Sequence, residues 1–167
     1  MKRNHWLYLL VLLCVTALVA WHYSDRDARR INKRLNQLAD TLGKESGEGQ
    51  LRTLAKSQQV VDFFTPEAEL RLQPVLRQRT SRRELSTIFH QVHSRLDTLD
   101  VRIRDRRLDV DESGETAEMR FTAVGTAGLA GDRETQMHEF HLQWVKQDRE
   151  WYIDRAEIVQ AIRPPRQ

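Results

Sequence analysis

The pattern of apolar and polar residues divides the chain into three stretches with different periods. The sixteen residues from Trp6 to Trp21 carry no charge. From Ala28 to Leu42 the apolar residues recur at intervals of three and four, the period of a helix. After Leu99 the period falls to two, which indicates strands. The pattern predicts an apolar N-terminal helix, further helices, and then a sheet.

The uncharged run predicts a membrane anchor over residues 1–23. At ~1.5 Å per helical residue, the run and its flanking residues just span a hydrocarbon core of ~30 Å. Aromatic residues near both ends suit the two membrane interfaces, and these are Trp6, Tyr8, Trp21 and Tyr23. The alternative is a cleaved signal peptide, because Lys2 and Arg3 precede the run. The large Leu18 makes a poor cleavage site before Trp21, so we expect an uncleaved anchor.

The direction of the anchor is given by two conflicting signals. A short basic tail before the run favours export of the C-terminal part, which would place it in the periplasm at a bacterial-type inner membrane. The cluster Arg26, Arg29 and Arg30 after the run favours a cytoplasmic-facing domain instead. We expect export, and the alternative stays open.

Residues 24–49 predict an amphipathic helix and a hinge. The apolar seam is typical of a short parallel coiled coil, with a homodimer contact formed by Ala28, Ile31, Leu35, Leu38 and Leu42. The same helix could instead lie on its own domain or on the bilayer. The following GKESGEG segment predicts a flexible hinge. We therefore expect a folded domain over residues 50–162 and a tail over 163–167.

Within that domain, two helices precede the strands. The first is expected to bury Leu51 and Leu54, and the second, capped by Ser81 with Glu84, is expected to bury one apolar stripe. In the first strand, Leu99, Val101 and Ile103 share one face, but Leu108 and Val110 fall on the other. This slip predicts a β-bulge between Asp105 and Arg107. The later strands place the inner face at Met119, Phe121, Phe140, Leu142, Trp144, Trp151 and Ile153.

The fold class is α+β, with helices packed on one side of a curved antiparallel sheet of four or more strands that forms a cone. The order of elements, the bulged strand and the closing hairpin WVKQDREWYIDRAEIV resemble the nuclear transport factor two-like superfamily, also called cystatin-like or SnoaL-like. The resemblance covers Gln50 to Ile162. It implies a shared fold and leaves the chemistry open.

Candidate catalytic and metal-binding residues are few. The resemblance implies that isomerases of this superfamily use a carboxylate base and a tyrosine in the cone. Only Tyr152 and Asp154 are weak candidates here, so we expect no catalysis. The histidines His90, His93, His138 and His141 cannot all converge on one metal ion, because the strand pair points to opposite faces. We expect the helical pair at the rim of its stripe, with no metal and no cofactor.

Charge suggests the kind of partner. Residues 23–110 carry a net charge of +5 and residues 111–167 carry −4. Arg102, Arg104 and Arg106 form a predicted stripe on one strand face that could contact an anionic partner. No aromatic residues interleave with them, which disfavours nucleic acid.

The sequence therefore predicts a single-pass, non-catalytic interaction module or scaffold that binds other envelope proteins. The alternative is a module that binds a small apolar ligand in the cone, with Phe121, Phe140 and Trp144 near its mouth. An isomerase- or dehydratase-type enzyme is the third reading.

Overall fold

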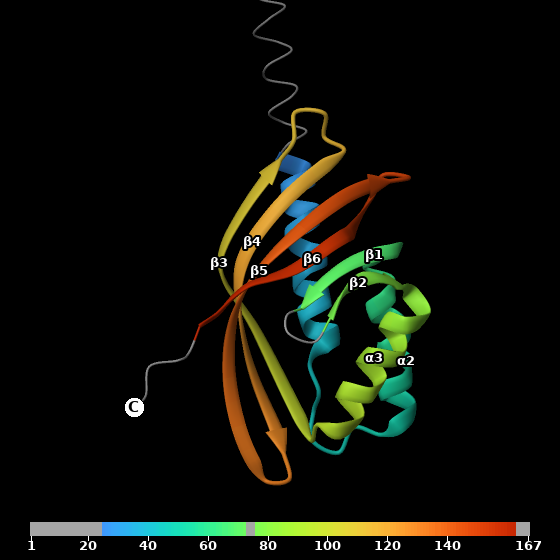
Figure 1. The fold of residues 1–167 in the computed structure, drawn as a ribbon, viewed down its shortest axis with the longest axis vertical. Helices are drawn as coiled ribbons and strands as arrows, with labels where there is room; N and C mark the ends of the chain where they lie inside the picture. Colours follow the sequence, from blue (N-terminus) through green and yellow to red (C-terminus); the bar gives the residue numbers. More distant parts are fainter. Residues whose placement is uncertain (1–24, 73–75, 163–167) are drawn as a thin grey trace, which may run out of the picture.

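The computed structural model describes residues 25–72 and 76–162. An N-terminal helix over residues 25–42 is followed by two further helices and six strands (Figure 1). Their bounds are α2 Gln50–Val61, β1 Phe64–Leu72, β2 Leu76–Ser81, α3 Arg82–Arg95, β3 Thr98–Val110, β4 Thr116–Leu129, β5 Asp132–Gln147 and β6 Glu150–Ile162. The predicted anchor residues Trp6, Tyr8, Trp21 and Tyr23 and the tail lie outside the described residues. Among the described residues, no helix is long and apolar enough to cross a membrane.

The six strands form one curved, open sheet in the order β2-β1-β6-β5-β4-β3 (Figure 1). Strands β3 to β6 make the predicted antiparallel meander. The β1–β2 hairpin extends it, because β1 pairs with β6 in parallel. The prediction of a purely antiparallel sheet is therefore wrong at that one ladder. Parallel pairing of strands so distant in sequence leaves no local signal.

The β-bulge in β3 is confirmed. The register with β4 shifts between Arg104 and Arg107, and Asp105 has a φ of 53°. Ile103 before the bulge and Leu108 after it both pack against the core, although they lie an odd number of residues apart. The extra residue thus restores burial along a 13-residue strand.

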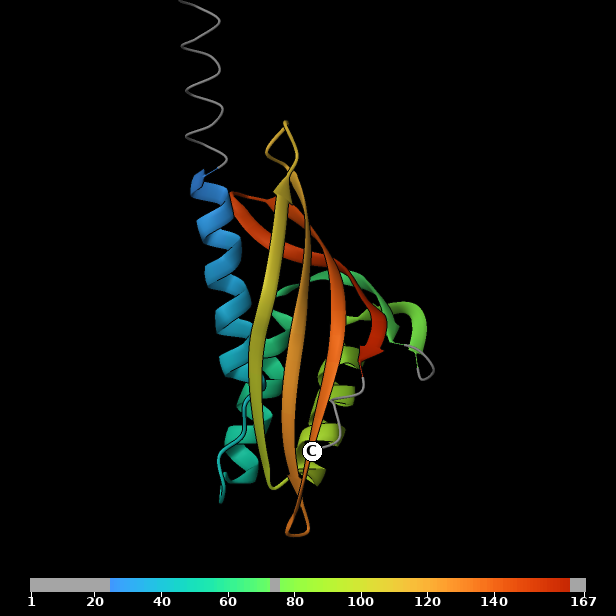
Figure 2. The same ribbon diagram turned by 90° about the vertical axis from the view of Figure 1, so that its left-hand side faces the viewer.

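The core lies on one face of the sheet and includes the N-terminal helix. Ile31 and Leu35 are 0% and 1% exposed, and both belong to the same buried cluster as Trp144 and Ile153. Figure 2 shows this helix beside β3, along the long axis of the molecule. The expected domain start at Gln50 is therefore corrected: the folded unit includes the N-terminal helix, because its apolar stripe covers part of the sheet.

The predicted dimer seam is corrected by the same packing. Ile31, Leu35 and Leu38 are buried within their own chain, and Leu42 packs against that core. These side chains are not available to a second chain while the domain is folded. Of the two alternatives left open by the sequence, the helix lying on its own domain is the one observed.

The two other predicted helices are present, but not all of their predicted faces are buried. In α3, Ser81 and Glu84 form the expected capping box. In α2, Leu51 is 85% exposed and Leu54 47%, whereas Thr53 and Ser57 are buried. Helix α2 therefore buries Val60 together with small polar residues, and its leucines face outward.

Candidate functional site

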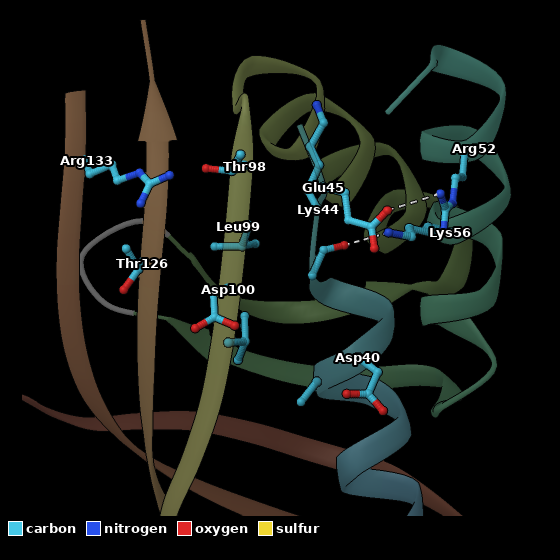
Figure 3. A pocket seen from close by; sticks show the side chains of 13 residues that line it. Asp40, Lys44, Glu45, Arg52, Lys56, Thr98, Leu99, Asp100, Thr126 and Arg133 are labelled. Carbon is cyan, nitrogen blue, oxygen red and sulfur yellow. Dashed lines mark hydrogen bonds and ion pairs between the residues drawn. The ribbon is translucent and has the colours of Figure 1, made fainter. Parts of the chain in front are cut away.

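A groove of about 480 Å³ opens at the edge of the sheet where β3 begins. The end of the N-terminal helix, the segment 43–45, α2 and β3 supply most of its wall, and β4 and β5 add one residue each (Figure 3). Its charged side chains are the cations Lys44, Arg52, Lys56 and Arg133 and the carboxylates Asp40, Glu45 and Asp100. A groove with both signs of charge can bind a polar molecule at two ends.

Lys44 fixes the loop that follows the N-terminal helix and forms part of the groove wall. Its backbone exchanges hydrogen bonds with Leu99, at 2.8 Å and 3.0 Å between nitrogen and oxygen, which forms an isolated antiparallel bridge. Its Nζ donates to the carbonyl oxygens of His93, at 2.8 Å, and of Leu96. These carbonyls lie at the end of α3, where a helix leaves its acceptors free. One lysine therefore joins the loop to both β3 and α3.

Lys56 of α2 holds the other end of the same loop. Its Nζ donates to the Gly43 carbonyl at 2.7 Å and to Glu48 Oε2 at 2.7 Å. The Glu48 side chain is 0% exposed. Burial raises the pKa of Glu48, but the hydrogen bond and the charge of Lys56 outweigh it and hold that pKa below its usual value. The predicted flexible hinge is thus tied down by a buried ion pair.

The glycine that begins this loop permits a close approach. A Cβ at Gly43 would lie 3.2 Å from the Asp40 carbonyl oxygen and 3.5 Å from that of Leu99. The chain leaves the N-terminal helix at this point and runs directly onto the edge of β3. A larger residue would press against the helix end, so glycine keeps the loop in the bridge.

His93 lies within this assembly rather than at the rim of its helix, which corrects the prediction. It is 1% exposed and stacks on Phe89, with ring centroids 4.8 Å apart. Burial and the nearby charge of Lys44 lower its pKa, and the Gly43 backbone only partly offsets this. Neither ring nitrogen reaches hydrogen-bond geometry with another described group. Both effects therefore favour the neutral form of the ring.

The remaining predicted histidines do not meet. His138 Nε2 lies 3.2 Å from Gln136 Oε1, and His141 Nε2 lies 3.4 Å from Glu118 Oε2. No group of three or more potential metal ligands is found within residues 25–72 and 76–162.

The two weak catalytic candidates lie on β6, outside the groove. The ring of Tyr152 is half-buried between the guanidinium groups of Arg34 and Arg82, at 5.1 Å and 6.0 Å. Asp154 is exposed and accepts a hydrogen bond from Thr65 Oγ1 at 3.1 Å. Tyr152 therefore packs with cations, and Asp154 binds a hydroxyl, as structural surface residues do.

The predicted arginine stripe is divided by the bulge. Arg102 pairs with Asp100 at 2.8 Å, and Arg104 is exposed and makes no hydrogen bond or ion pair with another described residue. Arg106 follows the bulge and donates from Nη2 to Asn36 Oδ1 on the N-terminal helix. The three side chains therefore do not share one face, because the extra residue turns Arg106 toward the helix side.

The concave face of the sheet, where the sequence left room for an apolar ligand, is filled. Trp144 and Trp151 are 0% and 1% exposed, and Met119 and Ile153 are 0% exposed. At the far end of the core, Asp27 accepts hydrogen bonds from Trp151 Nε1 at 3.1 Å and Lys146 Nζ at 2.7 Å. Trp144 is therefore a core residue, as the alternation predicts.

Sequence reasoning missed Lys44 and Lys56, which line the groove, Glu48, which pairs with Lys56, and Asp27 at the far end of the core. Glycines around Lys44 and Glu48 suggested flexibility, and the ion pair with Lys56 depends on how α2 packs. The contacts of Asp27 likewise depend on how its helix packs, so a single sequence provides no signal for any of the four.

Comparison with known proteins now gives the family. A family model described as a SnoaL-like domain matches residues 54–157. Comparison with curated protein sequences gives no match.

Solved structures share the fold. An NTF2-like protein with a cystatin-like fold from Novosphingobium aromaticivorans is 14% identical, with a TM-score of 0.69 over 86% of this chain and 87% of that one. A candidate scytalone dehydratase from the same species is 14% identical, with a TM-score of 0.68 over 85% and 88%. A candidate calcium/calmodulin-dependent protein kinase II association domain from Xanthomonas campestris is 15% identical, with a TM-score of 0.63 over 78% and 85%. At these identities the similarity shows the fold alone.

Proposed function

We propose that this chain, which belongs to the SnoaL-like domain family, is a non-catalytic binding module whose site is the groove at the start of β3. The supporting observation is the groove itself, which cations and carboxylates from separate segments line. The loop in its wall is fixed by a buried ion pair. Its volume of about 480 Å³ falls in the usual range for small-molecule sites. The ligand is a small polar molecule with charged groups of both signs.

This ligand differs from the apolar molecule that the sequence suggested. An apolar ligand would need space on the concave face, and Trp144 and Trp151 fill the core there. The groove wall instead offers Arg133 on one side and Arg52 on the opposite side to anionic groups, and Asp40 to a cationic one (Figure 3). Arg52 also reaches Glu45 at 3.5 Å, an exposed pair that a ligand carboxylate could replace at little cost.

The test is a binding screen on the full chain. Amino acids, dipeptides and betaines would be added in turn, and the melting temperature would be measured. A ligand of the groove should raise the melting temperature of the wild type and have no effect on Arg52→Gln/Arg133→Gln. The control Arg83→Gln/Arg95→Gln removes the same charge from exposed positions of α3 and should respond like the wild type. Equal responses in both variants would place binding elsewhere, and no response to any probe would contradict the proposed ligand class.

A membrane-held position is the second part of the proposal. The uncharged run from Trp6 to Trp21 supports an anchor, with the folded part exported and facing other envelope proteins. Carbonate extraction of cell membranes should leave the full chain in the pellet, and a fusion of alkaline phosphatase after Gln167 should be active. Release of the chain by carbonate would contradict the proposed anchor. An inactive phosphatase fusion together with an active cytoplasmic reporter would show that the folded part faces the cytoplasm.

One observation favours an enzyme as the second candidate. The buried His93 lies next to Lys44 of the groove, and its burial and the charge of Lys44 lower its pKa and favour the neutral imidazole. A neutral imidazole of this kind could act as a base, and one protein of similar fold is a candidate scytalone dehydratase. Any ligand found in the screen should be incubated with wild type and His93→Gln and analysed by mass spectrometry. Conversion by the wild type alone would favour the enzyme.

A further inference from the structure

Three exposed arginines stand close together beside the bulge of β3 with no partner. Arg104 and Arg107 lie on β3, and Arg120 lies on β4. All three are exposed, and none makes a hydrogen bond or ion pair with another described residue. The register places Arg107 directly opposite Arg120 and Arg104 opposite Thr122. The three side chains therefore share one patch of the outer sheet face.

The pair Arg107 and Arg120 costs folding energy. Like charges directly opposite each other on antiparallel strands are destabilising. Exposed carboxylates lie nearby, with Asp105 in the bulge and Asp109 opposite Glu118 one step further along the ladder, and none of them forms an ion pair with these arginines. A local arrangement that opposes stability and has no compensating contact within the chain is typical of a functional surface.

The N-terminal helix adds cations to this patch around the edge of the sheet. Arg29, Lys33 and Asn36 recur at steps of four and three, so they form one exposed ridge. Asn36 accepts the hydrogen bond of Arg106, which fixes that ridge against β3. Figure 2 shows the helix and β3 running side by side. The β3-edge basic surface thus consists of Arg29, Lys33, Arg104, Arg106, Arg107 and Arg120.

We propose that the β3-edge basic surface docks an extended, Asp- and Glu-rich segment of a partner protein. β3 is the terminal strand of the sheet, so a segment can cross its edge and meet cations on both sides. Residues 25–42 and 98–120 contain no aromatic side chain, so the stacking surface that single-stranded nucleic acids use is missing.

Distance from the start of the helix disfavours a lipid surface. Asn36, which marks the level of Arg106, lies eleven residues beyond residue 25, or ~17 Å along the helix axis. A bilayer that held the segment before residue 25 would meet the start of the helix first. Salt screens charges beyond ~8 Å at physiological ionic strength, so most of the surface is left for a protein.

The test uses the full chain in phosphatidylcholine nanodiscs and a fluorescent poly-L-glutamate peptide, with binding followed by anisotropy. Arg104→Gln/Arg107→Gln/Arg120→Gln should weaken binding about tenfold at low salt, because three close contacts are lost together. The control Arg79→Gln/Arg83→Gln/Arg95→Gln removes the same charge from exposed positions elsewhere and should change affinity less than about twofold. Arg107→Gln alone should keep or slightly raise the melting temperature, because it removes the repulsion from Arg120.

Three results would overturn the proposal. Equal losses in both triple variants would mean that only net charge matters. If Arg104→Gln/Arg107→Gln/Arg120→Gln kept its affinity for poly-L-glutamate but lost binding to phosphatidylglycerol vesicles, the surface would be a lipid contact. A melting temperature several degrees lower for Arg107→Gln would make that arginine structural.

Discussion

Two tryptophans on neighbouring strands occupy the centre of the core. Trp144 on β5 is 0% exposed and pairs in register with Ile153 of β6, while Trp151 reaches Asp27 through its indole nitrogen. Trp144 Nε1 has no hydrogen-bond partner among the described groups, so this side chain contributes through its volume. Its removal therefore measures packing rather than a polar contact.

Trp144→Ala should lower the free energy of unfolding by about 3–5 kcal/mol, because it removes a large buried ring and leaves a cavity. Denaturant unfolding followed by circular dichroism measures the change. Val92→Ala is the control, since Val92 is 56% exposed and should cost less than about 0.5 kcal/mol. A loss below about 1 kcal/mol for Trp144→Ala would mean that the surrounding side chains close the gap.

His93 gives the stability a dependence on pH. Its pKa is lowered in the folded chain by burial and by Lys44, so the unfolded chain binds the proton first as pH falls. The stability that follows from this lowered pKa is fully present above the pKa of an unfolded histidine, about 6.5, and is lost progressively as the pH falls below it. Wild type should therefore lose stability from about pH 6.5 downward. His93→Phe should reduce that slope, as measured by urea unfolding across pH, and His138→Gln should keep it. An unchanged slope in His93→Phe would assign the dependence to other groups.

At the residue scale, sequence alternation located Met119, Trp144 and Trp151 correctly but misplaced His93. The sequence predicted an apolar stripe on α3 with His93 at its rim, whereas the buried residues of α3 are Leu85 and His93, with Phe89 packed against the core. A small rotation of the helix separates the two faces. Which face is buried depends on the loop at Lys44, and no residue of the helix itself specifies that contact.

At the element scale, the N-terminal helix is attached to the sheet at both ends. Its last turn leads into the Lys44–Leu99 bridge, and at the other end of its described part Asp27 accepts hydrogen bonds from Lys146 and Trp151. The Asp27 side chain is 6% exposed and that of Lys146 24%, so the pair is only partly screened by water. The helix is consequently part of the folded unit along its whole described length.

Asp27→Ala should destabilise the chain by about 1–3 kcal/mol, because it leaves the buried indole N–H of Trp151 without an acceptor. Hydrogen exchange should accelerate first in residues 25–42, since the start of the helix loses its attachment. Asp25→Ala is the matched control at an exposed position of the same turn. Equal effects of the two substitutions would show that Asp27 acts only through the charge of the helix terminus.

Elements defined by local patterns were predicted well, and contacts between distant elements were not. The capping box at Ser81 and the bulge near Asp105 are specified by residues that are neighbours in the sequence. The parallel pairing of β1 with β6 and the ion pair between Glu48 and Lys56 arise only when the chain has folded. The groove belongs to the second kind, which is why its residues were absent from the sequence-based candidates.

At the scale of the whole molecule, one core joins segments that the sequence suggested were separate. A stripe at steps of three and four shows that a helix has an apolar face, but not which surface covers it. Here the sheet of the same chain covers it, so Ile31 and Leu35 carry the stability of the domain. The helix and the sheet should therefore unfold together in a single transition.

Leu35→Asp tests this unity, because an unpaired carboxylate at a position 1% exposed would be buried among apolar side chains. The substitution should cost about 4 kcal/mol or more and remove the sheet signal in circular dichroism together with the helix signal. Gln37→Asp, at an exposed position of the same helix, should be nearly neutral. Cys14 is the single cysteine of the sequence, so Leu35→Cys is tested in a Cys14→Ala background. In native membranes this variant should form no disulfide-linked dimer, because the new thiol lies inside its own domain. A strong disulfide-linked dimer of Leu35→Cys, together with a folded Leu35→Asp domain, would contradict this expectation. It would show that the helix contacts a second chain.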